Sequence, residues 1–230
     1  KKILGNYTDS SHLSNEEISE RNKLLNWDAV YLSNSEEATT YTIWWKQLYH
    51  NIYADEYAKA PANIQWPWET NCMEALLRDS NFIFVDDATT QHRETLREMV
   101  SISFKQALDT VAQLRSKDQL AWGKYQHTSI RHILKLPEFS AMDLMANGSA
   151  NALNATSTDH GQSWRMIVHL TPETEAYGIY PGGQSGNPGS IFYQPFVKDW
   201  AAQEYYKLWM MKSSEKTDSR IKAVMHFTAG

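Results

Sequence analysis

Two long stripes of apolar residues at helical spacing occupy the first half of this sequence, and they constrain its fold more than any other feature. The first stripe predicts a helix from about Ser35 to about Lys59, which Pro61 stops because proline cannot continue a helix. Its apolar positions are Ala38, Tyr41, Trp45, Leu48 and Ile52. The second stripe predicts a helix from roughly Thr90 to Arg115. Its apolar positions are Leu96, Val100, Phe104, Ala107, Val111 and Leu114.

Two shorter helices are predicted from local signals. Ser14 and Glu17 have the spacing of a capping box, in which a serine hydroxyl and a glutamate three residues later satisfy the first N–H groups of a helix. That helix would carry apolar residues at Ile18, Leu24, Leu25 and Trp27. Trp66-Pro67-Trp68 marks a turn, and a helix over Glu69 to Arg78 follows because Met73, Leu76 and Leu77 fall on one side.

The second half of the chain favours strands and loops. Trp122 to His132 alternates and is predicted as a strand with one wet face, and Asn147-Gly148-Ser149 to Asp159 is predicted as a loop. Trp164 to Leu170 is predicted as a buried or half-buried strand that Pro172 ends, and it forms a hairpin with a strand over Ala176 to Tyr180. Three further predictions complete the chain: helices at Tyr193 to Trp200 and Glu204 to Trp209, and a last strand at Arg220 to Phe227.

These elements predict an α+β fold, with helices over 1–118 and strands over 119–230 in a single domain or fragment. Apolar residues make up 42% and charged residues 21%, which is globular usage. The net charge of -5 and the lack of a basic stripe argue against nucleic-acid and anionic-membrane partners. No apolar run reaches the ~20 residues of a membrane span. A single cysteine, Cys72, excludes an internal disulfide.

Few side chains have the pattern of a catalytic or metal site. The loop Gly182 to Gly189 lacks the spacing of a phosphate-binding loop, so a structural turn is favoured, and Ser185 misses the pattern of a nucleophile elbow. His127 and His132 are five apart, which places them on opposite faces of the predicted strand. Asp86-Asp87 is predicted to lie in the loop before the second long helix rather than in a metal site.

Arg165 and four tryptophans are the more interesting residues. Arg165 lies within an apolar strand and needs a carboxylate or carbonyl partner if it is buried, so a structural fork is favoured over a substrate clamp. Trp45 belongs to an apolar stripe and is predicted to be core, with Trp44 flanking it. Trp66 and Trp68 are the best exposed candidates for an acyl or sugar surface, although packing against a neighbouring element is favoured.

Two segments in the second half resemble the penicillin acylase (penicillin amidase) family. They are His160-Gly161-Gln162-Ser163-Trp164-Arg165-Met166-Ile167-Val168 and Gly182-Gly183-Gln184-Ser185-Gly186-Asn187-Pro188-Gly189-Ser190. In that family the two motifs occur in this order near the end of the β chain, before a helix with an aromatic start, here Phe192-Tyr193 and Trp200. Weaker similarities cover most of the remaining chain, at Trp27-Asp28, Trp44-Trp45, Trp122-Gly123 and Asn151 to Thr156.

The resemblance implies an N-terminal-nucleophile hydrolase with an αββα sandwich, made by autocatalytic cleavage of a precursor. The first residue of the β chain, a serine, would attack a linear amide, with its own α-amine as base. Residue 1 here is Lys, so no catalytic, cofactor-binding or metal residue is assigned to this chain. The resemblance places the family's oxyanion asparagine and calcium ligands in sequence outside it, so no cofactor is expected in this chain.

The expectation is therefore the C-terminal part of an acylase, inactive alone. Its expected partners are the rest of the same precursor and a small amide substrate, such as an acylated β-lactam nucleus or homoserine lactone, in the periplasm or outside the cell. Two alternatives stay open. One is a non-catalytic binding or structural domain that keeps the acylase architecture, and the other, which nothing favours, is an aromatic-faced carbohydrate module.

Overall fold

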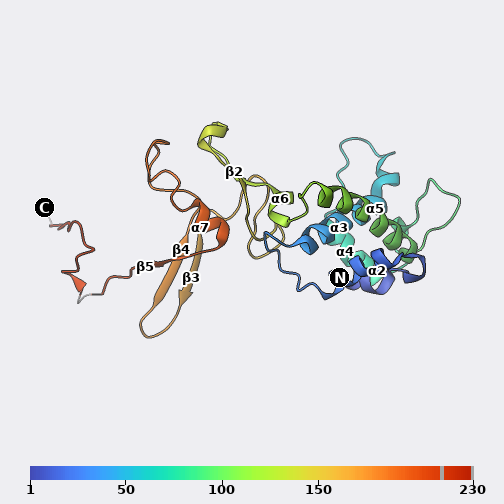
Figure 1. The fold of residues 1–230 in the computed structure, drawn as a ribbon, viewed down its shortest axis with the longest axis horizontal. Coiled ribbons are helices and arrows are strands. Elements are labelled where there is room, and N and C mark those ends of the chain that lie inside the picture. Colours follow the sequence, from blue (N-terminus) through green and yellow to red (C-terminus); the bar gives the residue numbers. More distant parts are fainter. Residues whose placement is uncertain (213–214, 229–230) are drawn as a thin grey trace.

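The computed structural model describes residues 1–212 and 215–228 and shows an elongated molecule (Figure 1). A helical body holds the N-terminal half, a short mixed segment follows it, and a small sheet and an extended C-terminal arm make up the rest. The predicted α+β class, with helices mostly N-terminal and strands mostly C-terminal, is confirmed. The strands of the described residues form one two-stranded and one three-stranded sheet, so the stacked sheets of an αββα sandwich remain an expectation for a longer protein.

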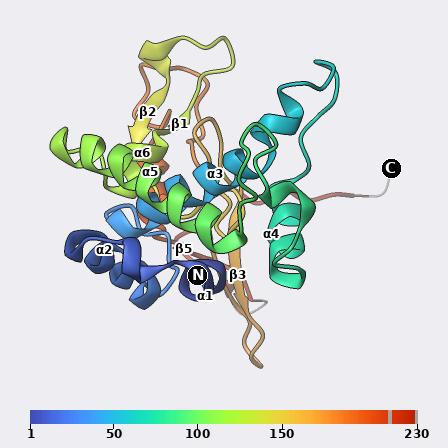
Figure 2. The ribbon, with the colours of Figure 1, turned by 90° about the vertical axis from the view of Figure 1, so that its right-hand side faces the viewer.

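The helical body is organised around the two long helices that carry the apolar stripes, α3 (Glu36–Tyr57) and α5 (Leu96–Ser116). These two helices pack along each other (Figure 2). Around them lie α1 (Lys2–Tyr7), α2 (Asn15–Asn26) and α4 (Glu69–Arg78), with single 3-10 turns at Ser10–His12 and Ile83–Val85. The predicted apolar stripes do form the core. Its fully buried members include Leu48, Ile52, Val100, Phe104 and Ala107. Trp44 is a correction: it lies in this core beside Trp45 rather than flanking it.

Helix starts follow their caps. The capping box of Ser14 and Glu17 is present at the start of α2, and Ser35 caps α3 through a bond from the Ala38 N–H. The second long helix begins at Leu96 and not at Thr90 as predicted, because Thr95 and Glu98 form another capping box. The residues before Thr95 are held in a loop, where Asp86 accepts a hydrogen bond from the Glu94 N–H. The position predicted for Asp86-Asp87 before α5 is therefore confirmed.

The predicted hairpin is confirmed as β3 (Arg165–His169) and β4 (Glu175–Ile179), which pair antiparallel with Arg165 opposite Ile179. Helix α7 (Val197–Ala202) is shorter and later than the predicted Tyr193 to Trp200 helix, since the preceding residues are tied into a loop. Gln203 then takes a left-handed backbone with φ 64° and ends the helix. The predicted helix at Glu204 to Trp209 is wrong: β5 (Tyr206–Leu208) pairs with β4, and this nonlocal pairing overrides local preference.

Two other strand predictions also need correction. Trp122 to His132 divides into a helix, α6 (Trp122–Gln126), and a strand, β1 (Thr128–Ile130). His127 has a left-handed backbone with φ 51° and separates the two, so it ends a helix rather than facing outward from a strand. β1 pairs with β2 (Ala141–Leu144), and a 3-10 turn at Pro137–Phe139 lies between them. Within the described segment 215–228, residues Arg220 to Phe227 form no strand.

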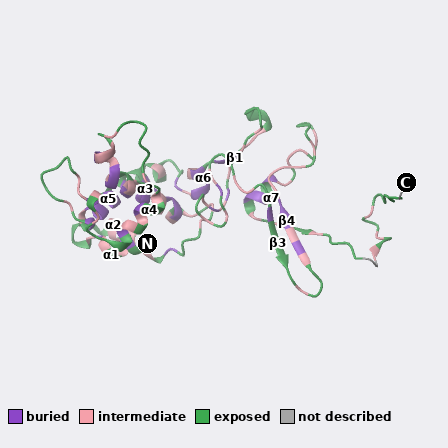
Figure 3. Ribbon diagram, turned by 180° about the vertical axis from the view of Figure 1, so that it is seen from behind, coloured by how far each residue is buried: buried purple, intermediate pink, exposed green. Residues whose placement is uncertain are grey.

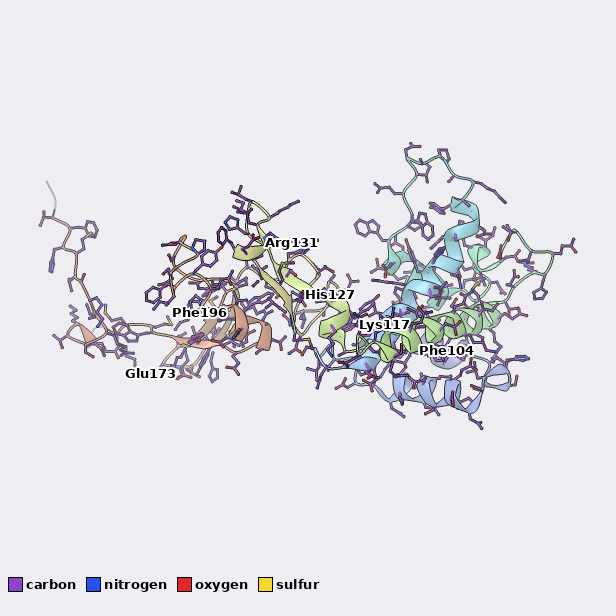
Figure 4. All side chains as sticks on the ribbon, turned by 45° about the horizontal axis from the view of Figure 1, so that its top comes forward. Phe104, Lys117, His127, Arg131, Glu173 and Phe196 are labelled. Atoms are coloured by element: carbon purple, nitrogen blue, oxygen red, sulfur yellow. The ribbon has the colours of Figure 1, made fainter. Side chains whose placement is uncertain are left out.

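The burial of β3 also differs from the prediction. Arg165 is buried, but the four residues after it are exposed (Figure 3). β4, by contrast, is partly buried because it lies between β3 and β5. Figure 4 shows Phe104 among the helices and Phe196 in the strand-rich part, which has its own small core around Ala146, Ile179 and Trp200. A third small cluster consists of Trp27, Ala38 and Trp122, so the described residues bury their apolar side chains around three centres.

Candidate functional site

The first of the two motifs that carry the family resemblance contacts Trp200, a fully buried residue of α7. The second motif is tied to the start of the same helix, where the Phe196 N–H donates to the Gly182 main-chain oxygen at 3.1 Å. Its indole N–H donates to the main-chain oxygen of Gln162 at 3.0 Å. A β-carbon at Gly161 would lie 2.5 Å from Trp200 Cζ2, so only glycine lets the chain pass this close to the ring. The residues before β3 are therefore fixed against α7 by a hydrogen bond and by close packing.

Arg165 completes this junction. Its Nε and Nη2 donate to Gln162 Oε1 at 3.0 and 2.9 Å, and its Nη1 donates to the Trp200 main-chain oxygen at 2.5 Å. The guanidinium carbon also lies 4.5 Å from the centre of the Trp200 ring, a cation–π arrangement. Among residues 1–212 and 215–228 no carboxylate forms an ion pair with Arg165, and burial lowers its pKa from the ordinary value.

This geometry favours a structural fork for Arg165. The sequence required a carboxylate or carbonyl partner for a buried guanidinium, and the structure supplies a carbonyl oxygen, an amide oxygen and an aromatic face. Three of the five N–H groups of the guanidinium are used in this way and its face lies on the Trp200 ring, which leaves little capacity for a substrate group. We refer to Gly161, Gln162, Arg165 and Trp200 as the motif junction.

The glycine-rich loop of the second motif is closed by its own backbone. The N–H groups of Gln184 and Ser185 both donate to the Phe192 main-chain oxygen, at 2.8 and 3.1 Å. A β-carbon at Gly183 would collide with that same oxygen and with Pro195 Cδ, which explains the glycine. The N–H groups that would cradle an anion are thus used inside the loop, which agrees with the predicted structural turn.

A second junction joins the helical body to the strand-rich part. The Ser33 N–H donates to Asn147 Oδ1 at 2.6 Å, and Trp122 Nε1 donates to the Gly148 main-chain oxygen at 2.6 Å. Thr156 Oγ1 donates to the Asn147 main-chain oxygen at 2.7 Å. Gly148 has φ 95°, a left-handed conformation that glycine adopts without strain. Residues that resemble the family at Trp122 and Thr156 therefore have a connecting role.

One serine–histidine contact escaped the sequence reasoning. Ser157 Oγ lies 3.0 Å from His160 Nδ1, the spacing at which a histidine can act as a base toward a hydroxyl. The Ser157 hydroxyl also lies 3.2 Å from the main-chain oxygen of His160, and within the described ranges no carboxylate orients the other ring nitrogen. The contact lies in an exposed turn, so its geometry is that of a local turn and not of a catalytic triad.

A buried carboxyl pair at the end of α3 was also missed. Asp55 Oδ1 and Glu56 Oε2 are both buried, and neither has a hydrogen-bond donor among the described residues. Burial and the neighbouring Asp55 carboxyl raise the pKa of Glu56 to about 7. Asp55 Oδ2 accepts a hydrogen bond from the Ala88 N–H at 2.6 Å, and the pKa of Asp55 lies below its ordinary value. The sequence does not predict this burial, because two adjacent acidic residues on a helix are typical of a solvent-exposed surface.

The remaining candidates lie apart from one another. His127 pairs with Asp143 at 3.0 Å in an exposed position, and His132 makes an edge-to-face contact with Phe139. Trp66 packs against Tyr49, Tyr53 and Tyr57, as favoured, whereas Trp68 is exposed. Cys72 is free and buried. In the part of the chain that the structure describes, no three His, Cys, Asp or Glu side chains are grouped to hold a metal ion, and no helix is long and apolar enough to cross a membrane.

Comparison with known proteins identifies a family for this chain. A family model described as penicillin amidase matches residues 2–217. An acyl-homoserine lactone acylase QuiP from Pseudomonas fluorescens (strain Pf-5) is 25% identical over 207 residues, which cover 81% of this chain. A protein of the same name from Pseudomonas syringae pv. tomato is 24% identical over 210 residues, again 81% of this chain. The chain spans 25% of the length of each of these relatives.

Proposed function

Because the chain belongs to the penicillin amidase family, whose model matches residues 2–217, we propose that it is the C-terminal part of an acylase that hydrolyses linear amides. The whole enzyme would split the bond between an acyl chain and an amine. This chain would contribute the structural junctions described above, and the rest of the precursor would contribute the reacting groups. The observation that carries the proposal is the motif junction, since the first family motif is fixed there against Trp200, in the aromatic helix that follows the second motif.

The nucleophile is proposed to lie outside residues 1–230. The chain spans 25% of the length of its relatives, and Ser185, the serine of the second motif, accepts a hydrogen bond from the Asn187 N–H at 3.1 Å instead of pairing with a base. A serine hydroxyl is a weak nucleophile at its free pKa and needs an adjacent base. An N-terminal serine of a processed β chain, with its α-amine as base, would meet that need. This chain alone is therefore proposed to be inactive.

An N-acyl homoserine lactone is the substrate class we favour, with an acylated β-lactam nucleus as the other candidate. The support is the printed name of the relatives, which are acyl-homoserine lactone acylases. Both candidate substrates are linear amides of a cyclic amine component, so one reaction serves both. A periplasmic or extracellular location would suit such a substrate.

The test compares the full-length gene product with residues 1–230. Intact mass would show whether the precursor is cleaved into two chains. Hydrolysis of a chromogenic phenylacetyl anilide, a fatty-acyl anilide and an acyl-homoserine lactone would show activity and acyl preference. We expect cleavage and turnover by the full-length protein and none by residues 1–230. If the full-length protein is neither cleaved nor active, the alternative of a non-catalytic domain with acylase architecture replaces this proposal.

A further inference from the structure

Strand β3 has an open edge. The order of the three-stranded sheet is β3-β4-β5, so β3 hydrogen-bonds to β4 on one side only. Every second residue of an antiparallel edge strand turns its N–H and C=O away from its neighbour. Among the described residues, no backbone hydrogen bond outside the sheet reaches residues 164–168. Unpaired groups in such a row are a template for another strand.

One face of the same sheet is apolar and uncovered. Met166, Val168 and Leu170 are 55%, 41% and 85% exposed, and Trp164, on the same face, is 47% exposed. Opposite them on the central strand are Gly178 and Ala176, which are small. Leu208 of β5 lies opposite Ala176, and its side chain and the Trp164 ring lie over Gly178, where a β-carbon would be 3.2 Å from Leu208 Cδ1 and 2.6 Å from Trp164 Cη2. Tyr206, opposite Gly178 on this face, donates its hydroxyl to Asp199, and among the described residues of these three strands none on this face is charged.

The opposite face is different in character. There β3 carries Ile167 and His169, and the ion pair of Glu175 with Lys207, at 2.6 Å, spans β4 and β5. Arg165 on this face is covered by α7. Water or a polar layer suits a face with such an ion pair. A strand with exposed apolar side chains, such as Met166 and Val168, is typical of a surface that is buried in an assembled protein. Figure 3 shows how β3 is exposed while β4 beside it is not.

The length of the relatives identifies what covers this surface. The chain corresponds to 25% of each relative, so most of a protein of that size lies outside residues 1–230. We infer that a β-strand from that outside part pairs with the open edge of β3, and that apolar side chains from the same part cover Met166, Val168 and Leu170. This inference rests on the proposal that the chain belongs to a longer acylase. It adds the surface through which the two parts join.

Cysteine labelling of the full-length protein tests the inference. Met166→Cys and Val168→Cys place a thiol on the apolar face, and Gln113→Cys on the outer side of α5 is the control. Cys72 is buried, and the unsubstituted protein corrects for cysteines elsewhere. Each maleimide rate is divided by the rate of the same variant in denaturing urea. We expect residues 166 and 168 to react at least about tenfold more slowly than residue 113 after this correction.

Hydrogen exchange of the unsubstituted full-length protein gives the second measurement, which no substitution can disturb. The expected result is slow exchange at every amide of residues 165–169, because both edges of β3 would be paired. Alternating fast and slow amides along residues 165–169 would overturn the inference, because they would show that one edge of β3 is unpaired. Protection that disappears on dilution, together with a dimeric mass, would also overturn it by identifying a second copy as the occupant.

Activity separates this inference from the proposed function. A full-length protein that protects β3 but hydrolyses no amide refutes the acylase proposal and leaves the docking surface in place. A protein that hydrolyses amides while β3 labels rapidly refutes only the docking surface.

Discussion

The guanidinium of Arg165 lies 4.5 Å from the centre of the Trp200 ring and also donates a hydrogen bond to the main-chain oxygen of that tryptophan. One residue begins β3 and the other lies in α7, 35 positions later. Burying a cation costs free energy unless its N–H groups are hydrogen-bonded. The contact therefore fixes the position of the Arg165 side chain and holds α7 against the sheet. The first two predictions concern this relationship.

Gly161→Ala should destabilise the protein by about 1–3 kcal/mol, because the added methyl group would overlap the Trp200 ring, and a fully buried ring has no space to move into. Gly186→Ala is the matched control, since a β-carbon there meets no described atom within 4 Å. Urea denaturation of the purified variants measures both. Equal stability of the two variants would mean that the close approach at Gly161 is not what positions α7.

Arg165→Lys should lower the free energy of unfolding by about 1–3 kcal/mol, because an ammonium group cannot reproduce the fork on Gln162 Oε1 and the bond to Trp200 at the same time. Arg131→Lys is the control. Arg131 makes an exposed ion pair with Asp159 at 2.8 Å, and such pairs contribute about 0–1 kcal/mol. The two variants differ only in where the arginine lies, so comparable losses at the two positions would contradict a structural role specific to Arg165.

The sequence predicted the helical body well because its signal is periodic. Ile52 and Phe104 fall on stripes that recur every three or four residues, and both are buried in the core. It predicted the strand-rich part less well because nonlocal contacts decide that part. Trp122 lies in a helix, and its indole N–H donates to the main-chain oxygen of Gly148, 26 positions away. β5 forms because it pairs with β4. No window of neighbouring residues contains those contacts.

The candidate site shows the same division. Arg165 could be singled out because a charge within an apolar run is unusual, and its burial is confirmed. The Asp55–Glu56 pair could not be singled out from the sequence, because two acidic residues near the end of a helix are typical of a solvent-exposed surface. The exposure of Met166 and Val168 could not be predicted either, since an apolar strand is read as buried whether its cover lies inside or outside the chain.

Thr95 determines where α5 begins, and its hydroxyl should be measurable in stability. Thr95→Ala removes the acceptor for the Glu98 N–H and should cost about 1 kcal/mol of unfolding free energy. Thr95→Ser keeps the hydroxyl and should stay close to the unsubstituted protein. Thermal denaturation of the three proteins side by side makes the comparison. A loss in Thr95→Ser as large as in Thr95→Ala would assign the effect to the threonine methyl group instead of the cap.

The Asp55–Glu56 pair should make stability fall as the pH rises from about 4.5 to about 7. Burial raises the pKa of Glu56 to about 7 from 4.5, so the folded protein keeps a proton that the unfolded chain releases at lower pH. A carboxyl with a raised pKa is favourable when protonated, and its contribution is lost as pH climbs through the folded-state value. The lowered pKa of Asp55 acts below pH 4, outside this window.

Glu56→Gln imitates the protonated carboxyl at every pH. The variant should therefore be more stable than the unsubstituted protein above pH 7, and its stability should change less between pH 4.5 and 7. Urea denaturation at a series of pH values measures this, with Glu138→Gln, an exposed glutamate in the 3-10 turn at Pro137–Phe139, as the control. Parallel pH profiles for the unsubstituted protein and Glu56→Gln would show that the Glu56 carboxyl is not held protonated by its burial beside Asp55.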